Sequence, residues 1–203
     1  MTLPSRRVAF LACLLLLAAP ATARADFFVI PFAGIKFGGS TSIVDLELAA
    51  GKNKLVLGAA ALKIGQGFLG YEVEFGTMPA YFENDEEAVE RPLVKAGSYV
   101  SDLTGSLVLS FPPSFTRGGL RPYAVIGGGL IHAESADFLE VFQVRRTVPA
   151  ITLGFGATGL ITNNVGVRFD LRHLRSISRD APSGGVGRHI DYWRFTMGLL
   201  LRP

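Results

Sequence analysis

Hydrophobic and polar residues alternate with a period of two along most of the chain after about residue 26. A two-residue period places successive side chains on opposite faces of a β-strand. Turn-rich stretches divide this pattern into eight segments. The segments are residues 27–38, 54–63, 68–79, 97–111, 121–133, 148–161, 165–177 and 190–202. The pattern therefore predicts an all-β protein of eight strands.

The connections between these segments differ in length in a regular way. Residues 64–67 and 162–164 are tight, and residues 112–120 are of moderate length. The other four connections, 39–53, 80–96, 134–147 and 178–189, are long. An even number of antiparallel strands, with short turns at one end and long loops at the other, is typical of outer-membrane barrels with periplasmic termini. An eleven-residue strand tilted by about 40° rises roughly 28 Å, enough for the apolar band. We predict an eight-stranded antiparallel up-and-down transmembrane β-barrel.

The composition of the two strand faces indicates which face is outside. In segment 190–202, Trp193, Phe195 and Met197 share one face, whereas Arg194 and Thr196 share the other. The polar faces are mostly Gly, Thr and Ser, without the dense Lys and Glu of a water-facing surface. This favours a narrow filled lumen inside a lipid-facing barrel over a soluble lipocalin-like barrel with apolar residues inward. Aromatic residues near the strand ends predict interface girdles: Phe27, Phe37, Tyr81, Tyr99, Phe111, Tyr123 and Trp193.

The first 25 residues have the features of a secretory signal peptide. Arg6 and Arg7 precede an apolar run over residues 8–19, and Ala23-Arg24-Ala25 supplies the small residues of a cleavage site. A membrane helix would need about 18 or more apolar residues. We expect a signal peptide over residues 1–25, cleavage near Ala25–Asp26, and a barrel domain over residues 26–203 in the outer membrane.

Charge and cysteine content exclude several functional classes. The chain has 20 Lys and Arg against 17 Asp and Glu, but three of the basic residues lie in the leader, which leaves 20 − 3 = 17 of each sign. A balanced chain gives no electrostatic support for nucleic-acid binding. The one cysteine, Cys13, lies inside the apolar run, so we expect neither disulfides nor cysteine–metal sites afterwards.

Four segments resemble the small OmpA/OmpX-like outer-membrane β-barrel family of Gram-negative bacteria. They are residues 30–37, 70–76, 122–130 and 165–172. The resemblance implies a structural or surface-interaction role, contact with outer-membrane lipid and lipopolysaccharide, a monomeric state, and assembly by the barrel-assembly machinery with periplasmic chaperones. One feature departs from the family pattern: the chain ends Leu201-Arg202-Pro203, without the usual terminal aromatic residue.

The motif Gly154-x-Gly156-x-x-Gly159 matches a dinucleotide-binding fingerprint. That fingerprint works only where a helix N-terminus follows and receives the pyrophosphate. Here a tight turn at residues 162–164 leads into another strand. We interpret these glycines as positions where a missing side chain leaves space inside a crowded lumen. We expect no cofactor and no metal.

Charged residues occur on the predicted lumen faces. They are Lys36, Glu72, Glu74, Asp102, Arg168, Asp170, Arg172 and Arg194. Glu72 and Arg168 lie at similar heights on strands that are four apart in an eight-membered ring, so they face each other. Because an unpaired buried charge is costly, we predict a structural ion-pair network that plugs the barrel. A gate or a narrow ion path is the alternative.

Histidines and loop residues offer weaker candidates. His132, His173 and His189 lie near the extracellular ends, where lipid A-modifying barrels carry a His–Ser–acid site. His173 and Ser176 are three residues apart, on opposite strand faces, so we predict no enzyme. Residues 83–90 are rich in acids (Glu83, Asp85, Glu86, Glu87, Glu90), which indicates a solvated tip or divalent-cation bridging to lipopolysaccharide phosphates. Residues 138–142 predict a hairpin above the membrane, and residues 182–187 a flexible loop.

Overall fold

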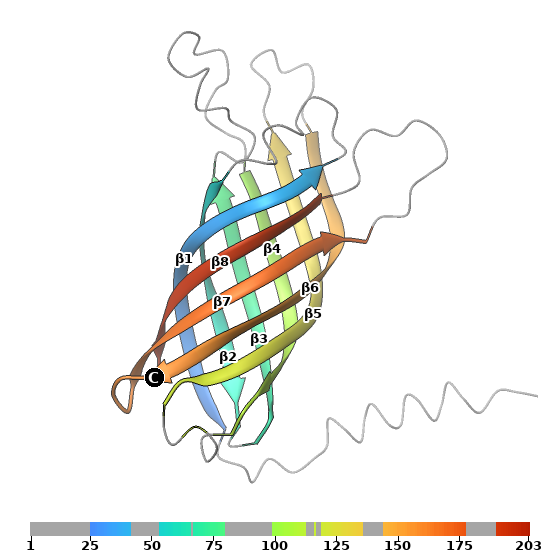
Figure 1. Ribbon diagram of the computed structural model, residues 1–203. Coiled ribbons are helices and arrows are strands. Elements are labelled where there is room, and N and C mark those ends of the chain that lie inside the picture. The colour runs from blue at the N-terminus through green and yellow to red at the C-terminus, as the bar shows by residue number, and fades with distance from the viewer. Residues whose placement is uncertain are drawn as a thin grey trace, which may run out of the picture.

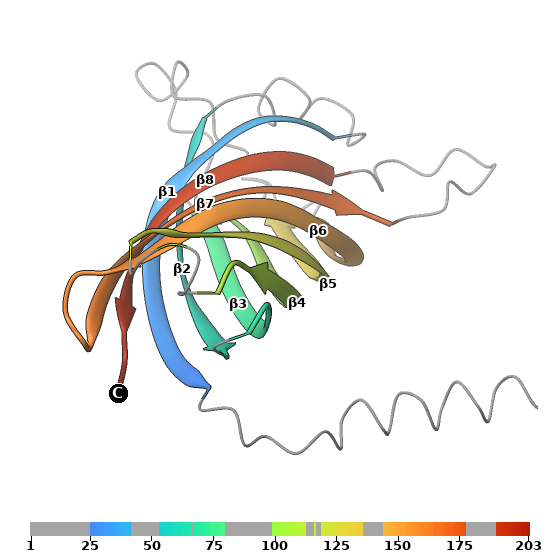
Figure 2. The same ribbon diagram turned by 60° about the horizontal axis from the view of Figure 1, so that its bottom comes forward.

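Eight strands form a closed antiparallel barrel in the computed structural model (Figure 1). The structure describes residues 25–41, 53–65, 67–79, 99–112, 116, 119–135, 144–177 and 190–203. The strands are β1 (Asp26–Thr41), β2 (Lys54–Ile64), β3 (Leu69–Pro79), β4 (Tyr99–Ser110), β5 (Arg121–Ser135), β6 (Val144–Leu160), β7 (Val165–Ser176) and β8 (Ile190–Leu201). Each strand pairs with its neighbour in sequence, and β1 pairs with β8 to close the barrel around one lumen (Figure 2). The predicted all-β, eight-stranded up-and-down barrel is confirmed.

Several predicted features fall outside the described residues. They are the leader up to residue 24, the acidic residues 83–90, the apolar residues 138–142, residues 182–187 and His189. Within the part of the chain that the structure describes, no helix is long and apolar enough to cross a membrane.

β1, β5 and β6 extend two or more residues past their predicted ends. β6 starts at Val144 rather than at residue 148, because its pairing with β5 continues beyond Pro149. The Pro149 carbonyl accepts a hydrogen bond from the Ile177 nitrogen, so this residue faces the end of β7. The missing Pro149 N–H therefore removes no hydrogen bond to β5. The hairpin of β5 and β6 extends as far as the pair Ser135 and Val144.

A bulge lets β1 continue to Thr41 instead of ending at residue 38. The register between β1 and β8 shifts between Phe37 and Ser40. Gly38 and Gly39 adopt φ values of 58° and 120°, which L-residues with side chains rarely adopt. A Cβ on Gly39 would also lie 2.5 Å from the Asp191 carbonyl oxygen. These two glycines are therefore required for β1 to pair with the start of β8.

The outer face of the barrel is apolar and the lumen face carries the charges. Phe155 on β6, for example, leaves 58% of its surface exposed, whereas its sequence neighbour Gly154 is buried. The face assignment predicted for segment 190–202 is confirmed in β8. Tyr123 is a correction: it is only 5% exposed and faces the lumen, so it is not part of an outer aromatic girdle. Tyr123 has the same parity on β5 as the inward residue Val125, and this parity decides which face its side chain occupies. Its location near a strand end, on which the girdle prediction rested, does not decide the face.

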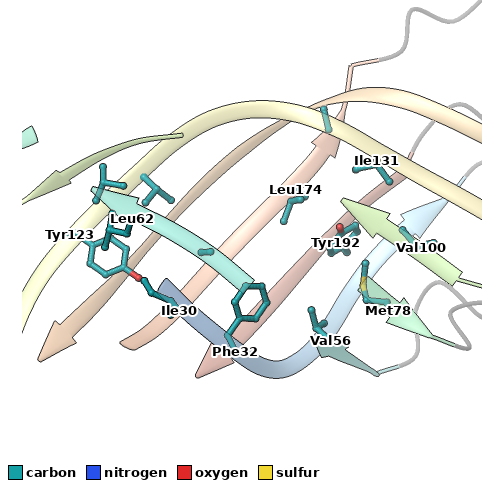
Figure 3. Packing of buried hydrophobic residues seen from close by; sticks show 14 of the residues in the cluster. Ile30, Phe32, Val56, Leu62, Met78, Val100, Tyr123, Ile131, Leu174 and Tyr192 are labelled. Atoms are coloured by element: carbon teal, nitrogen blue, oxygen red, sulfur yellow. The ribbon is translucent and has the colours of Figure 1, made fainter. Parts of the chain in front are cut away.

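The lumen is filled in layers. Apolar side chains occupy the end of the barrel beside the short connections, where Ile30, Leu62 and Tyr123 point inward from three strands (Figure 3). Another apolar group, including Val100 and Ile131, occupies the opposite end. The buried charges lie between these groups, because the middle lumen positions of β3, β4, β7 and β8 are the polar ones. A charged belt is thus enclosed by apolar side chains on both sides.

Candidate functional site: a charge network in the lumen

The first half of the network joins β3 to β7 across the lumen. Glu72 on β3 contacts two guanidinium groups from β7: Arg168 Nη1 reaches its Oε2, and Arg172 Nη2 lies 2.5 Å from its Oε1. Asp170 lies between the two arginines on β7. Its carboxylate is 2.8 Å from Arg168 Nη2 and 2.6 Å from Arg172 Nε. All four side chains are buried, so two carboxylates and two guanidinium groups share one desolvated cluster.

The second half joins β8 to β3 and β4. Arg194 Nη1 lies 3.0 Å and 3.1 Å from the two carboxylate oxygens of Asp102, and its Nη2 contacts Glu74 Oε1. Tyr192 donates its hydroxyl to Asp102 at 3.1 Å. Arg172 links the two halves, because its Nη1 is 3.3 Å from Glu74 Oε2. Seven of the eight predicted charges therefore belong to one connected set of contacts.

The eighth predicted charge, Lys36, lies in a row of cations. Its neighbours in register are Lys54 on β2 and Arg194 on β8. Lys36 and Lys54 are both buried on the lumen face. With Lys54 included, the described lumen holds five basic and four acidic side chains.

Two tyrosines that the sequence analysis did not include in the predicted charge network complete it. The Tyr123 hydroxyl donates to Asp170 Oδ2 at 2.5 Å and accepts from Arg168 Nε at 2.7 Å. Its ring also lies below the Arg168 guanidinium carbon, 5.0 Å from ring centroid to Cζ. Tyr192 holds Asp102 as described above. Tyr192 shares the parity of Arg194 on β8, and Tyr123 shares the parity of the inward residue Val125 on β5. This parity was the signal that could have identified them.

Glycines on β6 make room for this network. A Cβ on Gly154 would lie 2.7 Å from Arg172 Cγ, and one on Gly156 would lie 2.4 Å from the Tyr123 hydroxyl. Both distances are shorter than real Cβ contacts allow. The strand runs through a turn into β7 rather than into a helix. The glycine motif at residues 154–159 is thus explained by packing, and no phosphate-binding helix end stands behind it.

The arrangement determines what the site can do chemically. Buried charges are stable only where partners and hydrogen bonds replace the lost hydration, and here each of the four lumen carboxylates contacts at least one guanidinium group. Among the described residues, no group of three or more His, Cys, Asp or Glu side chains could hold a metal ion. The contacts favour a cross-braced plug that ties β3, β4, β5, β7 and β8 together through the middle of the barrel.

The histidines lie apart from this network. His173 faces outward and stacks on Trp193, with ring centroids 4.8 Å apart. Ser176 points into the lumen, where its Oγ accepts a hydrogen bond from the Ile190 nitrogen at 2.9 Å. The two side chains lie on opposite faces of β7 as predicted, so they do not form a base–nucleophile pair. His132 also faces outward, near the C-terminal end of β5.

Known proteins match this chain in structure. No protein-family model matches the sequence, and no curated protein does. Neisserial surface protein A matches with a TM-score of 0.60 and 15% identity, over 87% of this chain and 96% of that one. OprG of Pseudomonas aeruginosa matches with a TM-score of 0.51 and 13% identity, over 89% and 97%. Ail of Yersinia pestis, in complex with the heparin analogue sucrose octasulfate, also gives 0.51 and 13%, over 88% and 99%. The predicted resemblance to small outer-membrane barrels is confirmed at the level of the fold.

Proposed function

We propose that this protein is an integral outer-membrane β-barrel with a plugged lumen and a structural or surface-interaction role. The observation that carries the proposal is the distribution of side chains between the two faces. Large apolar residues such as Leu153 and Phe155 cover the outside, and the described lumen holds nine buried charged side chains. In water this arrangement would expose a large apolar surface, whereas in a bilayer it satisfies both faces.

The lumen contents support a plug rather than an open channel. The network crosses the barrel from β3 to β7 and from β4 to β8, and apolar layers lie on both sides of it. An eight-stranded barrel has an interior just wide enough for side chains to fill. We therefore propose that water and ions do not pass freely through the folded barrel.

A narrow gated pore is the second candidate, and one observation favours it. Thr104 Oγ1, Ser106 Oγ and Thr152 Oγ1 are buried on the lumen face without a hydrogen-bond partner among the described residues. Buried hydroxyls of this kind are usually satisfied by water. The wall formed by β4, β5 and β6 is thus the side along which an ion path would run.

A surface-interaction role is supported by two of the proteins that share this fold. They are a neisserial surface protein and the attachment invasion locus protein Ail, whose crystal structure was determined in complex with the heparin analogue sucrose octasulfate. We propose that this chain likewise presents its extracellular side to partners and is monomeric in lipid and lipopolysaccharide. Assembly would use the barrel-assembly machinery and periplasmic chaperones. We propose no enzymatic activity.

Membrane fractionation followed by planar-bilayer recording tests the proposal. The protein should be recovered with the outer membrane, and after insertion it should show conductance near zero. Recovery in the periplasmic supernatant would contradict the membrane placement. Stable conductance of the folded barrel would instead support the pore.

A further inference from the structure

A groove of about 810 Å³ crosses the outer face of β3, β4, β5 and β6. Its walls are outward apolar side chains, and its floor is backbone between residues whose side chains point into the lumen. The wall residues are Tyr71, Val73, Leu107, Ile126, Ile151 and Leu153. No charged side chain of this outer face lines the groove, so its occupant should be uncharged.

Two facing glycines create the groove. Gly105 on β4 and Gly128 on β5 are direct partners in register. On β4 the neighbouring outward positions are Leu103 and Leu107, both about half exposed. A Cβ placed on Gly105 would meet no atom within 4 Å. The missing side chain of Gly105, which lines the groove, therefore leaves the surface hollow there, and its partner Gly128 adds no side chain beside it.

A polar cluster lies on the same outer face, closer to the extracellular end of β4, β5 and β6. His132 and Thr147 are partners in register, and His132 Nδ1 is 2.8 Å from Thr147 Oγ1. His132 Nε2 is 3.6 Å from Glu134 Oε2, which accepts a hydrogen bond from the Tyr99 hydroxyl at 2.9 Å. Along β5, the four residue steps from Gly128 to His132 span roughly 13 Å.

We propose that the groove and this polar cluster together form a binding site for one membrane lipid. An acyl chain lies in the groove, and the ester or amide linkage of that chain lies against His132 and Thr147. The proposal rests on the proposed function, because it requires the outer face to lie in a bilayer. Polarity selects this ligand. The groove accepts only an apolar chain, and His132 and Thr147 offer hydrogen-bonding groups to a polar linkage at the end of that chain.

The geometry favours binding over catalysis. Thr147, His132 and Glu134 lie in the spatial order hydroxyl, imidazole, carboxylate. Such an order could activate Thr147 as a nucleophile. The 3.6 Å between His132 Nε2 and Glu134 Oε2 is too long for the hydrogen bond that orients the imidazole in such sites. The hydrogen bond that this carboxylate oxygen accepts within 3 Å comes instead from the Tyr99 hydroxyl. In this proposal the cluster therefore provides hydrogen-bonding groups to the polar end of a lipid whose acyl chain lies in the groove.

Native mass spectrometry of the full protein tests the site. The barrel is folded into dioleoyl phosphatidylcholine vesicles, its insertion is verified by heat-modifiable migration, and it is then extracted into mild detergent. Wild type should retain one phosphatidylcholine. Gly105→Leu should lose it, because the new side chain fills the groove without a clash. Ala33→Leu, which adds the same side chain to the outer face of β1, should retain it. Thr147→Val should lower retention about 5-fold through loss of one hydrogen bond.

The outcomes separate the site from the membrane placement. Failure of wild type to insert would overturn both. Normal insertion with no retained lipid, or with equal retention in wild type, Gly105→Leu and Ala33→Leu, would overturn the site alone. Appearance of free oleic acid and lysolipid in the same samples would overturn a binding role in favour of ester hydrolysis.

Discussion

Glu72 on β3 and Arg168 on β7 form an ion pair across the lumen, although 96 residues separate them in the chain. The pair joins opposite walls of the barrel, and neither group reaches solvent. Its energetic role can be measured, because the removal of one partner leaves a buried charge with fewer counterions than before.

The first prediction concerns this pair. Glu72→Gln and Arg168→Met should each destabilise the barrel, by about 3–5 kcal/mol where burial is complete and by less where water enters the lumen. The double variant should lose less than the sum of the two, with a coupling energy of about 0.5–3 kcal/mol. Urea unfolding in liposomes measures all four proteins. Strictly additive losses would show that the pair contributes nothing specific.

The outer face should tolerate charge only near the membrane boundary. Phe155→Arg places a cation on the lipid-facing side of β6 and should cost about 2–4 kcal/mol. Leu69→Arg, on the outer face at the first residue of β3, is the control near the membrane boundary and should cost about 0–1 kcal/mol. Unfolding free energies in liposomes give both values. A tolerated Phe155→Arg would mean that this face does not meet hydrocarbon.

Packing around the network should make Gly156 hard to replace. In Gly156→Ala the added Cβ meets the Tyr123 hydroxyl and the Phe169 carbonyl oxygen, so we expect a loss of about 1–3 kcal/mol. Gly105→Ala introduces the same methyl group where no atom lies within 4 Å, and it should be nearly neutral. Unfolding midpoints of the two variants provide the comparison. Similar midpoints would count against a crowded lumen at β6.

The Tyr123 hydroxyl should contribute through its two hydrogen bonds. Tyr123→Phe keeps the ring under Arg168 but removes the donor to Asp170 and the acceptor for Arg168 Nε. Because both partners are charged and buried, a loss of about 1–3 kcal/mol is expected. An unchanged unfolding free energy would show that other groups satisfy Asp170 and Arg168 equally well.

Much of this structure follows from the sequence pattern. Three features were enough to predict the barrel and the strand face that lines its lumen. They are the two-residue period, tight turns such as residues 162–164, and the apolar face of the last strand. Parity alone also placed Glu72, Asp102 and Arg194 in the lumen. Strand ends were harder to predict, because the glycine bulge at Gly38 and Gly39 and the direction of the Pro149 backbone depend on neighbouring strands.

Contacts between strands could not be read from the sequence. The roles of Tyr123 and Tyr192 depend on which carboxylate lies opposite each hydroxyl, and this is fixed by register and by the tilt of the strands. Lys54, at a strand start, was left out of the predicted set for a related reason: its parity becomes meaningful only once the strand boundary is known. The outer groove likewise exists only because Gly105 and Gly128 are paired in register.

Fluorescence of the single tryptophan tests the central claim most directly. Trp193 faces outward on β8 with 39% of its surface exposed, and it needs no substitution to serve as a probe. The folded protein is placed in vesicles whose phospholipids carry bromine on their acyl chains. A barrel with its apolar face in lipid predicts strong quenching by brominated chains and weak quenching by aqueous acrylamide. Strong acrylamide quenching without any effect of the brominated lipid would show that this face meets water and would contradict the account.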